Sequence, residues 1–118
     1  AVITKKAIEI GPRIQATLGK AYQSGVKIAF GTDAGVYQHG KNWLEFGYLI
    51  EAGMKPMDAI KAATINAAEL IGKKDKLGSI ETGKLADIVA VDGDPLKDAK
   101  AFGKVVFVMK DGKVYKNE

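Results

Sequence analysis

One short segment restricts the fold of this chain more than any other: an apolar run that stops abruptly in a glycine-flanked turn. Residues Val26–Phe30 have the composition of a buried β-strand, and Gly31–Gly35 (GTDAG) follow directly. The turn leaves one carboxylate, Asp33, at the carboxyl end of the predicted strand. In open α/β sheets and α/β barrels, ligand and catalytic sites are assembled at that end. The segment therefore predicts an α/β fold and makes Asp33 its first candidate functional residue.

The residues before this strand are predicted to be helical. Residues 3–24 place Ile14 and Leu18 on one helical face. We expect Gly11-Pro12 to interrupt this helix, because proline lacks a backbone N–H and restricts the residue before it. A helix followed directly by a buried strand is typical of α/β proteins.

Two further helices are predicted after the turn. Asn42 is a suitable N-cap for the first, and Glu45 completes a capping box three residues later. Pro56 suits the first position of the second helix, which we expect to continue without interruption through residues 57–71. Helical spacing predicts the buried stripe of the second helix, formed by Met57, Ile60, Thr64, Ala67 and Ile71.

The composition changes after Lys73 in favour of short strands. Residues 85–91 and 104–110 are apolar runs of strand length. Asp111-Gly112 follows the second run and is a strong signal for a β-hairpin. A few short strands are marginally stable alone and leave edges that need partners. We therefore expect an α/β region and a β-rich region that are both parts of something larger.

Composition excludes several classes of protein. The chain has 118 residues, of which 47% are hydrophobic and 27% are charged, so it is neither disordered nor collagen-like. No stretch reaches the roughly 18–20 apolar residues of a membrane span, and no signal-peptide pattern opens the chain. The absence of cysteine excludes disulfides and thiolate zinc sites and favours a cytoplasmic location. A start at Ala-Val-Ile rather than Met is what we expect of an excised or processed chain.

The net charge of +4 raises the question of a nucleic-acid partner. The lysines are scattered along the chain, Arg13 is the single arginine, and no basic cluster alternates with aromatic residues. The pattern indicates a solvated lysine-rich surface. We expect neither nucleic acid nor a membrane as a partner.

Asp33 and His39 are the candidate functional residues, and each has a structural alternative. Asp33 has the chemistry of a metal ligand or a general base, and equally that of a turn former. His39, the only histidine, is suited to binding metal or substrate, and equally to ordinary hydrogen bonds in a loop. Two such residues are too few for a closed metal site, which usually needs three or more protein ligands.

Five blocks of the sequence, taken in order, carry a family resemblance. They are Val26–Gly35, His39–Asn42, Glu51–Gly72, Leu77–Pro95 and Val108–Val114. Together they resemble the C-terminal part of amidohydrolase-superfamily enzymes, in the branch of imidazolonepropionase-like and Xaa-Pro dipeptidase (prolidase)-like enzymes. The resemblance implies that residues 1–72 form the last strand and helices of a (β/α)8 TIM-like barrel. It implies that residues 73–118 contribute strands to a small composite β-sandwich.

The resemblance also implies roles for the candidate residues. Asp33 would ligate a divalent metal, with zinc as the expected ion, and would shuttle a proton from the metal-bound hydroxide to the leaving amine. His39 would bind substrate. The intact parent would hydrolyse amide or peptide C–N bonds, Xaa-Pro dipeptides among them. The family's His-x-His pair, bridging lysine and two later histidines have no counterpart here, so we expect this chain alone to bind no metal and to be inactive.

The sequence leaves two interpretations open, and they place the chain in different classes of protein. In the first, the chain is part of a metal-dependent hydrolase, and its partners are a small-molecule or dipeptide substrate and the remainder of the parent chain. In the second, it is a non-catalytic α/β module that folds by self-association, as a homo-oligomer, or with a partner chain.

Overall fold

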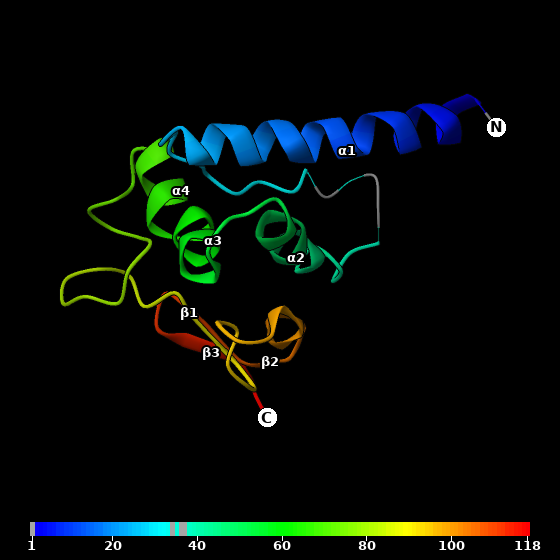
Figure 1. Cartoon of the computed structure of the whole chain (residues 1–118). Helices are drawn as coiled ribbons and strands as arrows, with labels where there is room; N and C mark the ends of the chain where they lie inside the picture. Colours follow the sequence, from blue (N-terminus) through cyan, green and yellow to red (C-terminus); the bar gives the residue numbers. More distant parts are fainter. Residues whose placement is uncertain (1, 34, 36–37) are drawn as a thin grey trace.

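The chain forms a group of helices packed beside a small antiparallel sheet (Figure 1). The computed structural model describes residues 2–33, 35 and 38–118, with side chains from residue 8 onward. Ala34, within the predicted GTDAG turn, lies outside the described residues. The long helix α1 lies on one side of the shorter helices, and the strands lie on the other side (Figure 1). The helices are α1 (Val2–Gln23), α2 (Leu44–Glu51), α3 (Pro56–Ala63) and α4 (Ile65–Leu70).

Helix α1 continues through Pro12, so the predicted interruption at Gly11-Pro12 is wrong. Because proline has no backbone N–H, the helix loses one hydrogen bond at Pro12, while the turns on either side keep theirs. The carbonyl freed by this loss belongs to Ile8, which is 70% exposed, so water can satisfy it. The helix therefore tolerates the proline because the affected turn faces solvent.

Three helices end at a glycine in the left-handed conformation. These are Gly25 (φ 81°), Gly53 (φ 102°) and Gly72 (φ 67°). After α2, for example, the N–H of Gly53 bonds to the Ile50 carbonyl at 2.9 Å and the next N–H bonds to the Leu49 carbonyl at 3.1 Å. This is the Schellman pattern, which satisfies the last carbonyls of a helix.

The start of α2 differs from the prediction. The side chain of Asn42 makes no capping hydrogen bond, and the residue before the helix is Trp43 in the helical conformation. Backbone turns lead into the helix instead, with the Leu44 N–H bonded to the Lys41 carbonyl at 3.1 Å. The predicted capping box at Asn42 and Glu45 is therefore wrong, because a helical backbone before Leu44 removes the extended geometry that an N-cap side chain needs.

The second predicted helix is divided at Thr64 into α3 and α4, so the prediction of one continuous helix over 57–71 is wrong. Thr64 has φ −124° and ψ −96°, outside the helical region. Its hydroxyl donates to the Ile60 carbonyl at 2.8 Å. Such a bond from threonine to the preceding turn competes with the helical ladder and often bends a helix. Pro56 is the first residue of α3, as predicted.

Alanines, rather than the predicted stripe, form the buried face of α3 and α4. Ala59 and Ala62 are fully buried, whereas Met57 is 45% exposed and Ile71 is 63% exposed. Small side chains let neighbouring segments approach closely, which periodicity of large apolar residues does not reveal. The core consists of Leu49, Met54, Ala59 and Ala62, with Leu18, Tyr22, Ile28, Phe30, Phe46 and Ile50 packed against it.

The β-rich tail forms a three-stranded antiparallel sheet in the order β1-β2-β3. The predicted hairpin is confirmed: Asp111 (φ 49°) and Gly112 (φ 76°) both have positive φ, as a type I′ turn requires. The 3₁₀ helix η1 lies between the first two strands in the sequence. The bounds are β1 (Ile88–Val91), η1 (Ala99–Gly103), β2 (Val105–Lys110) and β3 (Lys113–Asn117).

An aromatic run joins the sheet region to the helices. Phe46 of α2 stacks on Phe102 of η1, with ring centroids 4.0 Å apart, and on Phe30, with centroids 4.8 Å apart. The Trp43 ring packs against Gly103 so closely that a Cβ added there would lie 2.7 Å from it. Only glycine fits under the indole ring, so helices and tail pack as one body at this point.

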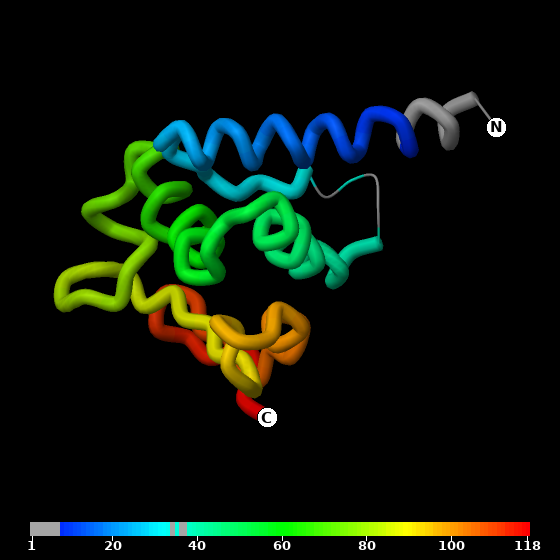
Figure 2. The backbone as a smooth tube through the Cα atoms, in the orientation of Figure 1, coloured from blue at the N-terminus to red at the C-terminus, as the bar shows by residue number. Residues whose placement is uncertain are grey.

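The predicted β-strand at Val26–Phe30 is not formed, because a strand needs a neighbour and the described part of the chain offers none beside it. The segment runs back beneath α1 toward α2 (Figure 2). Its backbone is bonded to the other helices: the Phe30 N–H donates to the Ala62 carbonyl at 2.9 Å, and Asn66 Nδ2 donates to the Ile28 carbonyl at 2.9 Å.

Among the described residues, no helix is long and apolar enough to cross a membrane.

Two glycine substitutions test the close contact of α1 with α2. Gly47→Ala adds a Cβ in open space inside α2 and should raise the free energy of unfolding by about 0.5–1 kcal/mol through helix propensity. Gly19→Ala adds a Cβ only 2.5 Å from the Ala52 carbonyl oxygen and should lower it. Urea denaturation measures both; stabilisation by both variants would contradict this packing.

Candidate active site

Asp33 lies in an exposed turn three residues beyond the anchored Phe30. Its backbone is left-handed (φ 46°), a conformation that aspartate tolerates better than most residues. The Gly35 N–H bonds to the Asp33 carbonyl at 2.7 Å and closes the turn. The structure thus confirms the turn and leaves the carboxylate open to solvent.

His39 is exposed in a second turn, beside Gly40 (φ 83°). Within the described ranges, no hydrogen bond or ion pair joins His39 to Asp33. The structure therefore places both residues in loops that follow the same segment without bringing their side chains into contact.

The side chains present do not form a complete metal site. In the part of the chain that the structure describes, no group of three or more His, Asp or Glu side chains is arranged to hold a metal ion. Asp33 supplies one carboxylate, and a closed site needs about three or more protein ligands.

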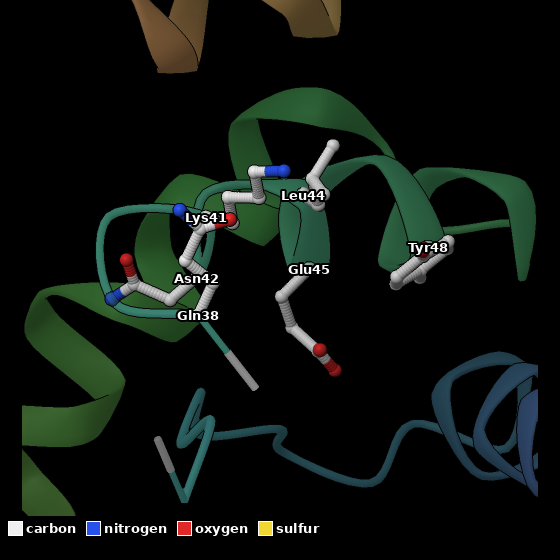
Figure 3. Close-up of a pocket in the computed structure, with 6 residues that line it drawn as sticks. All are labelled: Gln38, Lys41, Asn42, Leu44, Glu45 and Tyr48. Atoms are coloured by element: carbon white, nitrogen blue, oxygen red, sulfur yellow. The ribbon is translucent and has the colours of Figure 1, made fainter. Parts of the chain in front are cut away.

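A surface pocket of about 330 Å³ adjoins the His39 turn and the first turns of α2 (Figure 3). Glu45 extends into the open space between the labelled side chains, whereas the Lys41 side chain ends beside Leu44 and points away from the Glu45 carboxylate (Figure 3). The lining residues are Gln38, Lys41, Asn42, Leu44, Glu45 and Tyr48. The pocket thus presents the Glu45 carboxylate beside the loop that carries His39.

The pocket residues Lys41 and Glu45 were not predicted as functional from the sequence. Glu45 was assigned to the capping box, and the failure of that cap leaves its half-buried carboxylate facing the pocket. In the sequence, nothing distinguishes Lys41 from the many other lysines that are expected on the surface. The places of Lys41 and Glu45 on the pocket wall depend on the backbone turn that starts α2, so no sequence pattern marked them.

A second, apolar cavity of about 450 Å³ lies between the helices and the sheet. Its walls come from the aromatic run and from valines of β1 and β2. The lining includes Phe30, Trp43, Phe46, Phe102, Val89, Val91 and Val105. Its shape and chemistry suit packing of apolar groups, and it offers no catalytic side chain.

Three of the groups with shifted pKa values, Tyr22, Asp58 and Glu69, join α1 and residue 27 to α3 and α4. The hydrogen bond from the Tyr22 hydroxyl to Asp58, at 2.7 Å, lowers the pKa of Asp58, with Lys61 adding to the effect. The same bond raises the pKa of Tyr22. The hydrogen bond from Lys27, at 2.8 Å, lowers the pKa of Glu69. Of the two bonds, the exposed Lys27–Glu69 pair contributes little to stability, because water screens it.

Comparison with known proteins identifies the family. The model of the amidohydrolase family matches residues 4–115 of this chain. The chain belongs to the amidohydrolase family. The resemblance predicted from the five sequence blocks is thereby confirmed.

Relatives with hydrolase names match most of the chain. The ochratoxinase of Aspergillus niger is 42% identical over an alignment of 106 residues, which covers 82% of this chain and 22% of that protein. The imidazolonepropionase of Fusobacterium nucleatum subsp. nucleatum is 41% identical over an alignment of 76 residues, which covers 62% of this chain and 18% of that protein. The chain thus spans about a fifth of the length of these relatives.

Solved structures match the whole architecture. A Xaa-Pro dipeptidase crystallised with bound methionine superposes with a TM-score of 0.90 and 54% identity, over 96% of this chain and 28% of that one. Molinate hydrolase superposes with a TM-score of 0.75 and 32% identity, over 83% of this chain and 25% of that one. The helices and the three-stranded sheet of this family are therefore present here.

The variant Tyr22→Phe tests the bond to Asp58. Because the folded-state pKa of Asp58 is lowered, the bond stabilises the fold above the unfolded-state pKa of about 3.9, and this stability is lost as pH falls through the folded-state value. The pKa of Tyr22 is raised, so the contribution of Tyr22 to the stability of the fold is present below about pH 10. This contribution is lost as pH rises through the folded-state pKa.

We expect the Tm of Tyr22→Phe to lie below that of the wild type between about pH 4 and pH 10, with the difference shrinking in acid. Thermal unfolding followed by circular dichroism at a series of pH values measures this. Tyr115→Phe is the control, since Tyr115 is 64% exposed. A Tm difference that persists unchanged at pH 2 would contradict the assignment.

Proposed function

We propose that this chain is the C-terminal portion of a metal-dependent amidohydrolase that hydrolyses amide or peptide C–N bonds, Xaa-Pro dipeptides among them. The observation that carries the proposal is the likeness to the Xaa-Pro dipeptidase structure, at 54% identity over 96% of this chain. The parent enzyme is then roughly three and a half times as long as this chain, in line with the 28% of that structure that is covered.

In this proposal residues 1–72 are the last strand and helices of a (β/α)8 barrel, and residues 73–118 belong to a composite β-sandwich. Two features support the division. Residues 26–30 lack a partner strand among the described residues, as expected of a barrel strand whose neighbours belong to other parts of the chain. The sheet of the tail has two unpaired edges, at β1 and β3, where further strands can add.

Asp33 is the proposed metal ligand and proton shuttle, and His39 is the proposed substrate-binding residue. Support comes from the position of Asp33, exposed at the end of a segment whose backbone is anchored to the helices. A divalent metal, with zinc as the proposed ion, would polarise the scissile carbonyl and acidify a water molecule when bound. The Asp33 carboxylate would accept a proton and release it to the leaving amine. The other ligands of the metal would come from the rest of the parent enzyme.

The proposed partners are a small-molecule or dipeptide substrate and the remainder of the parent chain or a second copy, with neither nucleic acid nor a membrane involved. The proposed location is the cytoplasm. The alternative, a non-catalytic module that folds with itself or with a partner chain, is favoured by apolar residues on the sheet edges. Val89 of β1 is 61% exposed and Tyr115 of β3 is 64% exposed.

The chain alone is expected to bind no stoichiometric metal and to hydrolyse no Xaa-Pro dipeptide, because it supplies one carboxylate to the site. Elemental analysis of the purified 118-residue chain and a ninhydrin assay for released proline measure the two properties. Metal at one ion per chain together with turnover would contradict the predicted inactivity.

The variant Asp33→Asn in the complete enzyme tests the catalytic role. We expect kcat to fall by about 10²–10⁴-fold, the usual contribution of a positioned acid or base. Asp111→Asn is a matched control, because Asp111 has nearly the same backbone conformation (φ 49° against 46°) but lies in the hairpin of the tail. Equal kcat values for the two variants would refute the assignment of Asp33.

A further inference from the structure

We propose that Asn66 is a positioning residue for Asp33, because the break between α3 and α4 forms a clamp that holds residues 26–30 by their main chain. The inference rests on the proposed catalytic role of Asp33. It goes beyond that role by naming the group that sets where the Asp33 turn begins.

The clamp consists of two hydrogen bonds to one stretch of backbone. Asn66 Nδ2 donates to the Ile28 carbonyl at 2.9 Å, and the Phe30 N–H donates to the Ala62 carbonyl at 2.9 Å. In an extended chain, the polar backbone groups of residues two apart point to the same edge. Asn66 and Ala62 therefore hold one edge of this segment, much as a neighbouring strand does.

The division of the helix at Thr64 makes the clamp available. In a continuous helix the Ala62 carbonyl would accept the backbone N–H four residues later, that of Asn66. The conformation of Thr64 (φ −124°, ψ −96°) interrupts this ladder, and the carbonyl bonds to Phe30 instead. The break thus turns an internal helical bond into an external one.

The loop around Gly78 supports the break from outside. Gly78 has φ 90°, and a Cβ added there would lie 2.8 Å from the Ala68 side chain and 2.9 Å from the Thr64 carbonyl oxygen. A side chain at Gly78 would collide with the divided helix, so the loop and the break fit each other. The break is therefore a built feature of the packing rather than a frayed helix end.

The clamped segment leads directly to the candidate catalytic residue. Ala62 is fully buried, Ile28 and Phe30 pack against the core, and the Phe30 ring stacks on Phe46. Asp33 follows Phe30 by three residues and is exposed. The clamp thus anchors the main chain three residues before Asp33 and helps to fix where the turn that carries the carboxylate begins.

A second contact between the same elements provides a matched control. Lys27 Nζ bonds to Glu69 Oε1 at 2.8 Å, and both side chains are well exposed (60% and 40%). An exposed ion pair contributes little to stability or position, because water and salt screen it. Glu69→Gln therefore removes the charge attraction between the same segment and the same helix without touching the main chain.

The first arm of the test uses the 118-residue chain. Asn66→Leu replaces the amide with an apolar group of similar size, and it should speed hydrogen exchange of the Phe30 amide by about tenfold, the effect of one lost hydrogen bond. Glu69→Gln should change that rate by less than about twofold. Asn66→Asp, which keeps the shape but loses the donor, serves if the leucine variant does not fold. An unchanged Phe30 exchange rate in a folded variant would overturn the clamp.

The second arm uses the complete enzyme and separates this inference from the proposed function. Asn66→Leu should lower kcat by about 10²-fold with little change in KM, as expected when a catalytic group is displaced by about 1 Å. In the Asp33→Asn background the same substitution should have no further effect, because the group it positions is gone. Retention of full kcat by Asn66→Leu, where Asp33→Asn is impaired, would overturn the clamp alone. An equal loss in both backgrounds would show that Asn66 acts independently of Asp33, which also overturns the clamp.

Discussion

The contact of the alanine face of α3 with residues 28–30 is the interaction on which the rest of this structure depends. Ala59 and Ala62 are fully buried, and their small side chains let the segment lie against the helix closely enough for a main-chain hydrogen bond. Phe30 then stacks on Phe46, and Phe46 stacks on Phe102 of the tail. A series of contacts therefore connects α3 to the sheet region through the rings of Phe30, Phe46 and Phe102.

This arrangement fits the proposal that the chain supplies one part of an active site that the rest of a parent enzyme completes. The helices and the tail hold residues 26–30 at a defined place, and Asp33 follows in an exposed turn. In the described part of the chain, Asp33 does not belong to a group of three or more His, Asp or Glu side chains that could hold a metal ion. The proposed chemistry therefore requires the rest of the parent, whose strands would pair with residues 26–30 and whose side chains would complete the ligands.

Features that depend on a few neighbouring residues were predictable. The hairpin at Asp111-Gly112 needs positive φ, which these two residues adopt at low cost, so the residue pair alone identified it. Predictions that depended on distant contacts failed. The capping box at Asn42 was wrong because the backbone enters α2 through turns, and the continuous second helix was wrong because Thr64 and the loop at Gly78 divide it.

By itself the sequence determined the family, the hairpin at Asp111-Gly112 and the turn that carries Asp33, because ordered motifs and turn residues are local properties. Only the tertiary structure decided that Ala62 and Asn66 meet residues 28–30, that Glu45 faces a pocket, and that residues 26–30 remain unpaired among the described residues. The physical reason is that hydrogen bonds between segments some 30 to 40 residues apart follow from packing, and packing around small alanines leaves no periodic signal in the sequence.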